Sequence, residues 1–315
     1  MMIRALRPTD IIAYLSFRNR ALSNGALIRP GDRPTPSSIK GFLSRSLGID
    51  PRCQSWAKIQ SGRIHGVVSV KARLGTDIWD IEHIVALPDE AEVVIESLLR
   101  HVSVAASEEG VQKIFLRSIL EDTVTSAAKQ AGFYQYAVER IYWLPSSRAA
   151  PPSLVMRPRR GSDHHAIFQL YCSVVPHVVR QVEGVTLQEW RWTEGWGINR
   201  VGWRMSLPRR RMDFVLDTDE ELSAWLQVRT RSRSISIMAR HDLEEELPQI
   251  VRFGIMNLAA EGPVFCPVRH YQTFMEPALL KEGFRLVAEH ALLAKSLTIR
   301  VPERKLVPIR AHVSH

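Results

Sequence analysis

The stretch Ala127-Ala128-Lys129-Gln130-Ala131-Gly132-Phe133 has a second version, Ala278-Leu279-Leu280-Lys281-Glu282-Gly283-Phe284, and the two Gly-Phe pairs lie 151 residues apart. Each version is typical of a helix that ends at a glycine and leads into a strand. The starts of the two copies show a similar offset, because Arg7-Pro8 before Asp10 matches Arg157-Pro158 before Asp163 at 150 residues. A register kept over this distance predicts two copies of one fold.

The length and composition agree with two domains of a soluble globular protein. The chain has 315 residues, of which 45% are hydrophobic and 24% charged, and domains commonly contain about 100–200 residues. Residues 147–153 include Ala149-Ala150-Pro151-Pro152 and are expected to form a linker. We therefore expect one domain at 1–146, a second at 154–299, and a basic tail at 300–315.

The hydrophobic pattern predicts the same order of elements in both halves. In the first half we expect strands at 3–6, 55–60, 64–73, 79–87, 113–117 and 135–144, and helices from residue 9 or 10 through Leu22, at 91–107 and at 123–130. In the second half we expect strands at 154–157, 212–217, 221–230, 234–240, 264–268 and 286–295, and helices at 164–175 with more helix to about Trp192, at 247–260 and at 274–281. The strand–helix–strand passages make part of each sheet parallel.

This order, with Lys-x-x-Gly-Phe in one half and Lys-x-Gly-Phe in the other, resembles the GCN5-related N-acetyltransferase (GNAT) superfamily, in particular bacterial proteins with two units in tandem. The resemblance implies an α/β fold with two GNAT-like domains, and transfer of an acetyl group from acetyl-CoA to an amine. It also implies that acetyl-CoA binds between two diverging parallel strands, with its pyrophosphate at the start of the following helix. A carboxylate on the fourth strand then accepts the amine proton, and a tyrosine returns a proton to the thiolate.

Glu82 is the candidate general base, on the strand expected at 79–87. Strict alternation puts Asp80, Glu82, Ile84 and Ala86 on one face and Trp79, Ile81, His83 and Val85 on the other. Apolar neighbours would raise the pKa of this carboxyl group, and Asp80 or His83 would assist it. The alternative is a charge without a chemical role. The corresponding strand at 234–239 has no acid, so at most the N-terminal domain is active.

The expected cofactor site consists of the end of this strand and the start of the next helix: Val85, Leu87, Asp89, Glu90 and Ala91. Neither this segment nor its counterpart at 241–248 contains a glycine, and both are acidic. Their carboxylates are expected to cap the helix and repel a pyrophosphate. The alternative function is therefore an inactive tandem GNAT-fold protein that binds a partner protein, a small ligand or nucleic acid.

The tyrosine expected four residues before each Gly-Phe is absent, since Ala128 and Leu279 stand there. Tyr136 is the candidate substitute, and the alternative is a half-buried aromatic residue of the last strand.

An aromatic and basic segment is the candidate acceptor site, through Trp190, Trp196, Arg200 and Trp203. Packing of a large loop is one alternative reading of this segment, and nucleic-acid binding is another. The net charge of +9 allows a polyanionic partner, although most arginines are dispersed. Arg229, Arg231 and Arg233 share one face at the end of a strand, where they grip an anion or form a solvated edge.

The remaining features of the sequence argue against a metal-binding, a membrane or a secreted protein. The cysteines Cys53, Cys172 and Cys266 are scattered without metal-ligand spacing, so we expect reduced thiols and no metal site. No apolar run reaches the roughly 18–20 residues that span a bilayer, so no membrane partner is expected. The N-terminus lacks a signal-like apolar stretch, which makes a cytoplasmic protein the expectation. The acceptor amine and the oligomeric state stay open.

Overall fold

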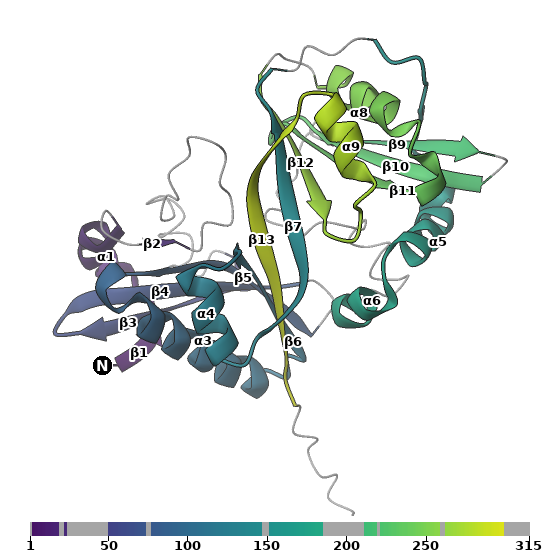
Figure 1. Cartoon of the computed structure of the whole chain (residues 1–315). Coiled ribbons are helices and arrows are strands. Elements are labelled where there is room, and N and C mark those ends of the chain that lie inside the picture. Colours follow the sequence, from purple (N-terminus) through teal and green to yellow (C-terminus); the bar gives the residue numbers. More distant parts are fainter. Residues whose placement is uncertain are drawn as a thin grey trace, which may run out of the picture.

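A computed structural model of the chain describes residues 2–18, 22–23, 50–73, 77–146, 151–184, 211–218, 221–258 and 262–298. These residues form two lobes joined by one continuous sheet of thirteen strands (Figure 1). Parts of the expected linker and the whole expected tail lie outside the described residues.

The two halves have the same order of elements. The first half contains β1 (Met2–Ala5), η1 (Pro8–Asp10), α1 (Ile11–Arg18), β2 (Leu22–Ser23), β3 (Cys53–Gln60), β4 (Arg63–Ala72), β5 (Ile78–Ala86), η2 (Pro88–Glu90), α3 (Ala91–Glu108), β6 (Lys113–Ile119), α4 (Thr123–Gln130) and β7 (Tyr134–Leu144). The second half contains β8 (Arg157–Pro158), η3 (Gly161–Asp163), α5 (His164–Val174), α6 (His177–Glu183), β9 (Arg211–Thr218), β10 (Glu221–Arg229), β11 (Ser234–Ala239), η5 (His241–Leu243), α8 (Leu247–Met256), β12 (Val264–Arg269), α9 (Met275–Lys281) and β13 (Arg285–Ser296).

Three predictions at element ends were wrong. Leu22 belongs to β2, where it pairs with Ala86, and is not part of the first helix. The strand expected at 154–157 is the short β8. The helix expected to continue to about Trp192 is interrupted after Glu183, because Gly184 takes a left-handed conformation with φ 59°, and residues 185–192 lie outside the described residues.

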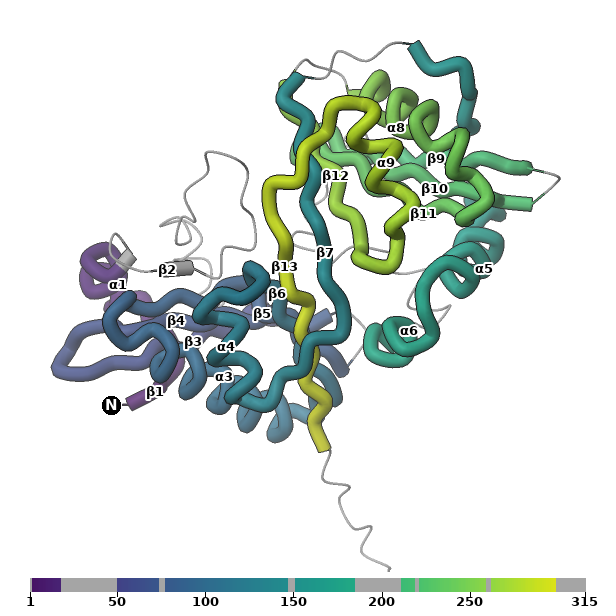
Figure 2. The backbone as a smooth tube through the Cα atoms, viewed as in Figure 1, coloured from purple at the N-terminus to yellow at the C-terminus, as the bar shows by residue number. Residues whose placement is uncertain are grey.

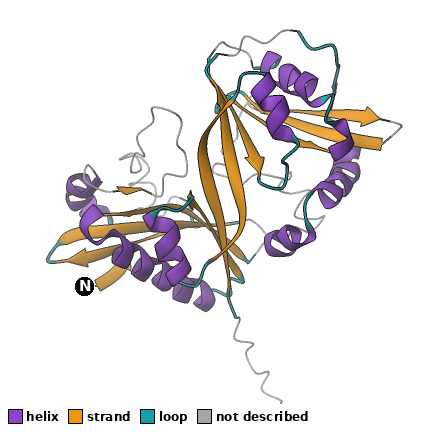
Figure 3. Cartoon of the chain, in the orientation of Figure 1, coloured by secondary structure: helices purple, strands orange, loops and turns teal. Residues whose placement is uncertain are grey.

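Helices cover both faces of the sheet in each lobe (Figure 3). In the first lobe, α3 and α4 bury their apolar sides against one face of the sheet, and α1 packs against the other face. In the second lobe, α8 and α9 cover one face, and α5 and α6 cover the other. The expected α/β class with a mixed sheet is confirmed, since β5–β6 and β11–β12 are parallel while the other described pairs are antiparallel.

The last strand of each half completes the sheet of the other half. The strand order is β1-β3-β4-β5-β6-β13-β7-β12-β11-β10-β9-β8. β13 therefore lies between β6 and β7 of the first half, and β7 lies between β12 and β13 of the second half. The two long strands run side by side from one lobe to the other (Figure 2). Both halves thus depend on each other for backbone hydrogen bonds.

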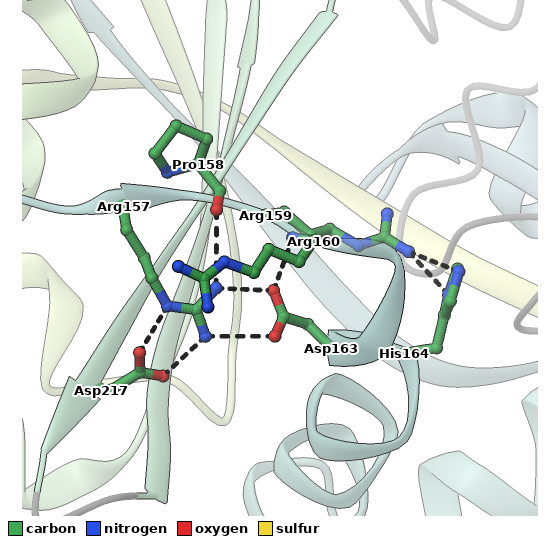
Figure 4. A network of polar contacts seen from close by, with 7 residues as sticks. All are labelled: Arg157, Pro158, Arg159, Arg160, Asp163, His164 and Asp217. Carbon is green, nitrogen blue, oxygen red and sulfur yellow. Dashed lines mark hydrogen bonds and ion pairs between the residues drawn. The ribbon is translucent and has the colours of Figure 1, made fainter.

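A half-buried arginine–aspartate pair joins the first strand of each half to its first helix. Arg157 donates to Asp163 at 2.8 and 3.1 Å and also contacts Asp217 (Figure 4). Arg4 makes the same bidentate contact with Asp10, at 2.8 and 2.7 Å. This equivalence corrects the offset of the two starts from 150 to 153 residues, because the sequence match had aligned Arg7 with Arg157.

Candidate functional site

A β-bulge interrupts β5 at the candidate general base. Ser69 on β4 pairs with His83, whereas the next residue, Val70, pairs with Ile81, so Glu82 is the extra residue of the bulge. Ile81 and Ile84 both lie in the core under α3. The two residues between them consequently face the opposite side of the sheet.

The bulge overturns part of the predicted alternation. Asp80 and Glu82 do share a face, but Ile84 and Ala86 lie in the other face's core together with Trp79 and Ile81. A two-residue period cannot continue through an inserted residue, so every side chain after it changes face. His83 consequently lies on the same side as Glu82.

Glu82 has charged and polar neighbours instead of the expected apolar ones. Its side chain is 10% exposed, and Oε1 lies 3.8 Å from Lys71 Nζ. Burial and then the Glu82 carboxylate raise the pKa of the Cys53 thiol to about 11. Lys71 favours the ionised carboxylate, which is the form that accepts a proton. Sequence reasoning missed Lys71, because it lies on the neighbouring strand β4 and only strand pairing brings it to Glu82.

Asp80 is engaged elsewhere. Its two carboxylate oxygens accept hydrogen bonds of 2.6 and 2.8 Å from Arg73, whose guanidinium also lies 4.7 Å from the centre of the Phe115 ring. Asp80 therefore holds the end of β4 against β5. The structure does not support it as an assistant to Glu82.

The parallel strands β5 and β6 stop pairing next to Glu82. Their register runs from Ile78 with Lys113 to Ile81 with Leu116. We call the strand ends beyond the last pair, residues 82–86 and 117–119, the first-half fork. Glu82 is thus the first residue of the fork.

The start of α3 offers backbone N–H groups without a capping side chain. Neither Leu87 before η2 nor Glu90 before α3 makes a side-chain capping hydrogen bond. Asp89 and Glu90 are exposed, and Glu90 Oε2 lies 3.5 Å from His65 Nδ1. The expectation that these carboxylates cap the helix is therefore wrong.

This segment fits the diphosphate of a coenzyme through its backbone, because an uncapped helix start binds anions. Val85 and Ala91 are buried and shape the turn into the helix. Leu87 is half-buried against the α1 core. The charges of Asp89 and Glu90 oppose a diphosphate at the same place.

Tyr136 lies on β7, on the side of the first-half fork where the strands are still paired. Its ring meets Phe115 edge-on, with centroids 5.8 Å apart. Burial, and then the Glu183 carboxylate, raise the pKa of the phenol well above its ordinary value. Tyr136 therefore keeps its proton at neutral pH and is a weaker acid than an ordinary phenol.

In the second half, the side chain of Gln272 links the two parallel strands, β11 and β12, that correspond to β5 and β6. β11 and β12 pair in parallel at Ser234 and Phe265. Further along, the amide of Gln272 donates to Ile237 O of β11 at 3.3 Å and accepts from Arg269 N at the end of β12 at 3.1 Å. Gln272 is 1% exposed. No motif in the sequence indicates that Gln272 links β11 to β12.

The structure does not describe the candidate residues of the acceptor site. The four residues of the proposed acceptor site, Trp190, Trp196, Arg200 and Trp203, lie outside the described residues. In the part of the chain that the structure describes, no group of three or more His, Cys, Asp or Glu side chains could hold a metal ion. Within the same residues, no helix is both long and apolar enough to cross a membrane.

Comparisons with known proteins bear on the fold. No family model matches the sequence, and no curated protein does. A GCN5-related N-acetyltransferase from Sphaerobacter thermophilus is 14% identical, with a TM-score of 0.55 over 94% of this chain and 95% of that one. A functionally unknown conserved protein from Staphylococcus epidermidis ATCC 12228 is 8% identical, with a TM-score of 0.50 over 73% and 91%. A tandem GNAT protein from the clavulanic acid biosynthesis pathway is 12% identical, with a TM-score of 0.47 over 94% and 98%. Because the first of these likenesses spans both halves and the strand order repeats, the chain has the fold of the GCN5-related N-acetyltransferase (GNAT) superfamily, present twice.

Proposed function

We propose that the chain is an acyl-CoA-dependent N-acyltransferase with its active site at the first-half fork. The observation that carries this proposal is the bulge in β5, which puts the Glu82 carboxylate where β5 and β6 cease to pair. An amine acceptor needs a base at this point, because a protonated amine has no lone pair for attack on a thioester.

Glu82 accepts the proton of the incoming amine in this mechanism, directly or through water. The Lys71 ammonium lies 3.8 Å from this carboxylate and attracts its negative charge. Tyr136 is the candidate proton donor to the leaving thiolate, and the raised pKa of its phenol opposes this transfer. Acetyl-CoA, when bound, supplies the activated acyl group.

Five residues are proposed to hold acetyl-CoA. Asp89, Glu90 and Ala91 at the start of α3 face its diphosphate, through the backbone N–H groups of Asp89 and Glu90, because Ala91 N already donates to Pro88 O. Val85 and Leu87 line its path. The negative charges of Asp89 and Glu90 repel the diphosphate, so we expect weak binding of acetyl-CoA. The segment with Trp190, Trp196, Arg200 and Trp203 is proposed to receive the amine acceptor, which is a small molecule or a protein.

The second half is proposed to be inactive as a transferase. Its β11 carries no acid, and Gln272 occupies the backbone groups that link the two strands of its fork. A coenzyme would have to share Ile237 O with the Gln272 amide.

The test is calorimetric titration of the full chain with acetyl-CoA, followed by turnover with a panel of amines. We expect one molecule of acetyl-CoA per chain. Glu82→Gln should leave this binding intact and slow acyl transfer by about 10²–10⁴-fold, the usual contribution of a general base. Glu245→Gln, an exposed residue of the second half, is the control and should behave as the wild type. No binding at millimolar acetyl-CoA would contradict the proposal and leave a binding protein as the function.

A further inference from the structure

One face of the second-half sheet changes from apolar to charged along its strands. Under α5, this face presents Val215, Trp225 and Met238, which form a core with the helix. Paired residues share a face of the sheet, and the same face is reached again two residues further along each strand. The next row of side chains on this face is therefore Asp213, Gln227 and Ser236. The row after it, at the ends of the strands, is Arg211, Arg229 and Ser234.

Arg211 and Arg229 are direct partners in the antiparallel ladder of β9 and β10. Like charges directly opposite each other destabilise a strand pair. The nearby carboxylate, Asp213, is occupied by Arg211, whose Nε lies 3.0 Å from Oδ2. Asp213 also accepts a hydrogen bond of 3.2 Å from Gln227.

Arg229 is left with one neutral contact. Among the described residues its guanidinium makes a single hydrogen bond, from Nε to Gln227 Oε1 at 2.8 Å, and no ion pair. Burial, and then the charge of Arg211, lower the pKa of this guanidinium below its ordinary value. The carboxylates of Asp213 and Glu139 act in the opposite direction but do not outweigh burial and Arg211, so the charge of Arg229 is only partly compensated.

The surroundings of Arg229 suit an oxyanion. Ser234 lies opposite Arg229 in the β10–β11 ladder, and its hydroxyl is 2.8 Å from that of Ser232. Two guanidinium groups with adjacent hydroxyls provide the donors that carboxylates and phosphates bind, often through two parallel N–H groups of one arginine. We propose that Arg229 and Arg211 form a binding site for a carboxylate or phosphate group on the α5 face of the second half.

The row of three arginines expected from the sequence does not make this site. β10 ends at Arg229, Arg231 is exposed, and Arg233 turns away with φ 48° to donate to the carbonyl groups of Gly262 and Pro263. Arg229 therefore acts with its cross-strand partner. The site is separate from the first-half fork, so it does not depend on acyl transfer.

The test titrates the full-length protein with inorganic phosphate and, separately, with acetate, at constant ionic strength. Binding is measured by calorimetry and by the rise in melting temperature. We expect saturable binding of at least one anion with a dissociation constant below about 10 mM, a weak but specific affinity. The arm that saturates first identifies the group as a phosphate or a carboxylate.

Arg229→Gln should abolish this binding and should not lower the melting temperature without added anion, since it removes repulsion from Arg211. Arg231→Gln is the matched control and should bind like the wild type. If Arg229→Gln fails to fold, Arg229→Lys keeps the charge without the paired donors and should bind at least about threefold more weakly. No saturation in the wild type, equal loss in Arg229→Gln and Arg231→Gln, or wild-type binding in Arg229→Lys would each overturn the proposal.

Discussion

Single side chains fix the two copies of the fold in the same way. Asp10 and Asp163 each accept two hydrogen bonds from an arginine and one from a backbone N–H three residues earlier in the chain. These contacts tie a first strand to the turn that begins a helix. The pattern is shared by Arg4 and Arg157, although the sequence match pointed to Arg7.

The pH dependence of stability follows from Asp163. The hydrogen bond from Arg157 is the largest cause that holds the pKa of this carboxyl group below its ordinary value. The folded pKa is thus lower than the unfolded value of about 3.9. The stabilisation is complete above the unfolded pKa and is lost as the pH falls through the folded pKa.

Asp163→Asn should therefore lower the free energy of unfolding at pH 7 by about 1–3 kcal/mol, and the difference from the wild type should shrink below about pH 4. Chemical denaturation of both proteins from pH 7 to pH 3 measures this. Glu244→Gln, an exposed residue, serves as the control. A difference that stays constant down to pH 3 would count against the ion pair as its source.

Gly132 and Gly283 are required by the backbone. Their φ angles are 86° and 84°, and each ends a helix before a buried phenylalanine. Alanine at either position should cost about 1–2 kcal/mol, because a β-carbon disfavours the left-handed region. Gly161→Ala is the matched control, since its φ is not positive and a β-carbon there meets nothing within 4 Å. Equal melting temperatures for Gly132→Ala and Gly161→Ala would contradict this account.

Elements that repeat a simple period were predictable from the sequence, and those that break it were not. The helix at Ala91–Glu108 follows its apolar spacing and buries Val94, Leu98 and Val102. The strand with Glu82 was placed correctly, but its bulge could not be predicted, because the alternation of apolar and polar residues does not mark the inserted residue. Gln272 was missed for a related reason, because its role depends on two strands that meet only in the folded chain.

The start of α3 makes a prediction about cofactor affinity. Asp89 and Glu90 are exposed and do not cap the helix, so their charges are available to repel a diphosphate. The double substitution Asp89→Asn with Glu90→Gln should tighten acetyl-CoA binding about two- to fivefold per charge removed. Titration calorimetry at low ionic strength measures the change, and added salt should reduce it. Unchanged affinity would mean that the diphosphate does not bind at this helix start.

At the scale of the whole molecule, the exchange of last strands was not foreseeable from either half. Each half carries a complete set of elements, so sequence reasoning predicts two self-contained units. The choice between pairing within a half and across halves depends on the distance between their sheets. That distance is a property of the complete chain, in which β7 lies between β12 and β13.

The exchange predicts that the first half does not form a stable monomer alone. Residues 1–146 lack β13, so the edges of β6 and β7 lose the strand that pairs with both. Unpaired strand edges template association with other chains. Expressed alone, this fragment should be insoluble or should form dimers and larger species, as measured by light scattering after size-exclusion chromatography.

Addition of residues 151–315 as a separate chain should restore a one-to-one complex, because β13 then regains its place between β6 and β7. The matched control is the full chain cut once within residues 147–150, which keeps every described strand and should stay assembled. A monomeric 1–146 fragment with a cooperative transition at the melting temperature of the full chain would show that β13 adds nothing to the first-half sheet. In that case the shared hydrogen bonds would be a consequence of lobe packing and not its cause.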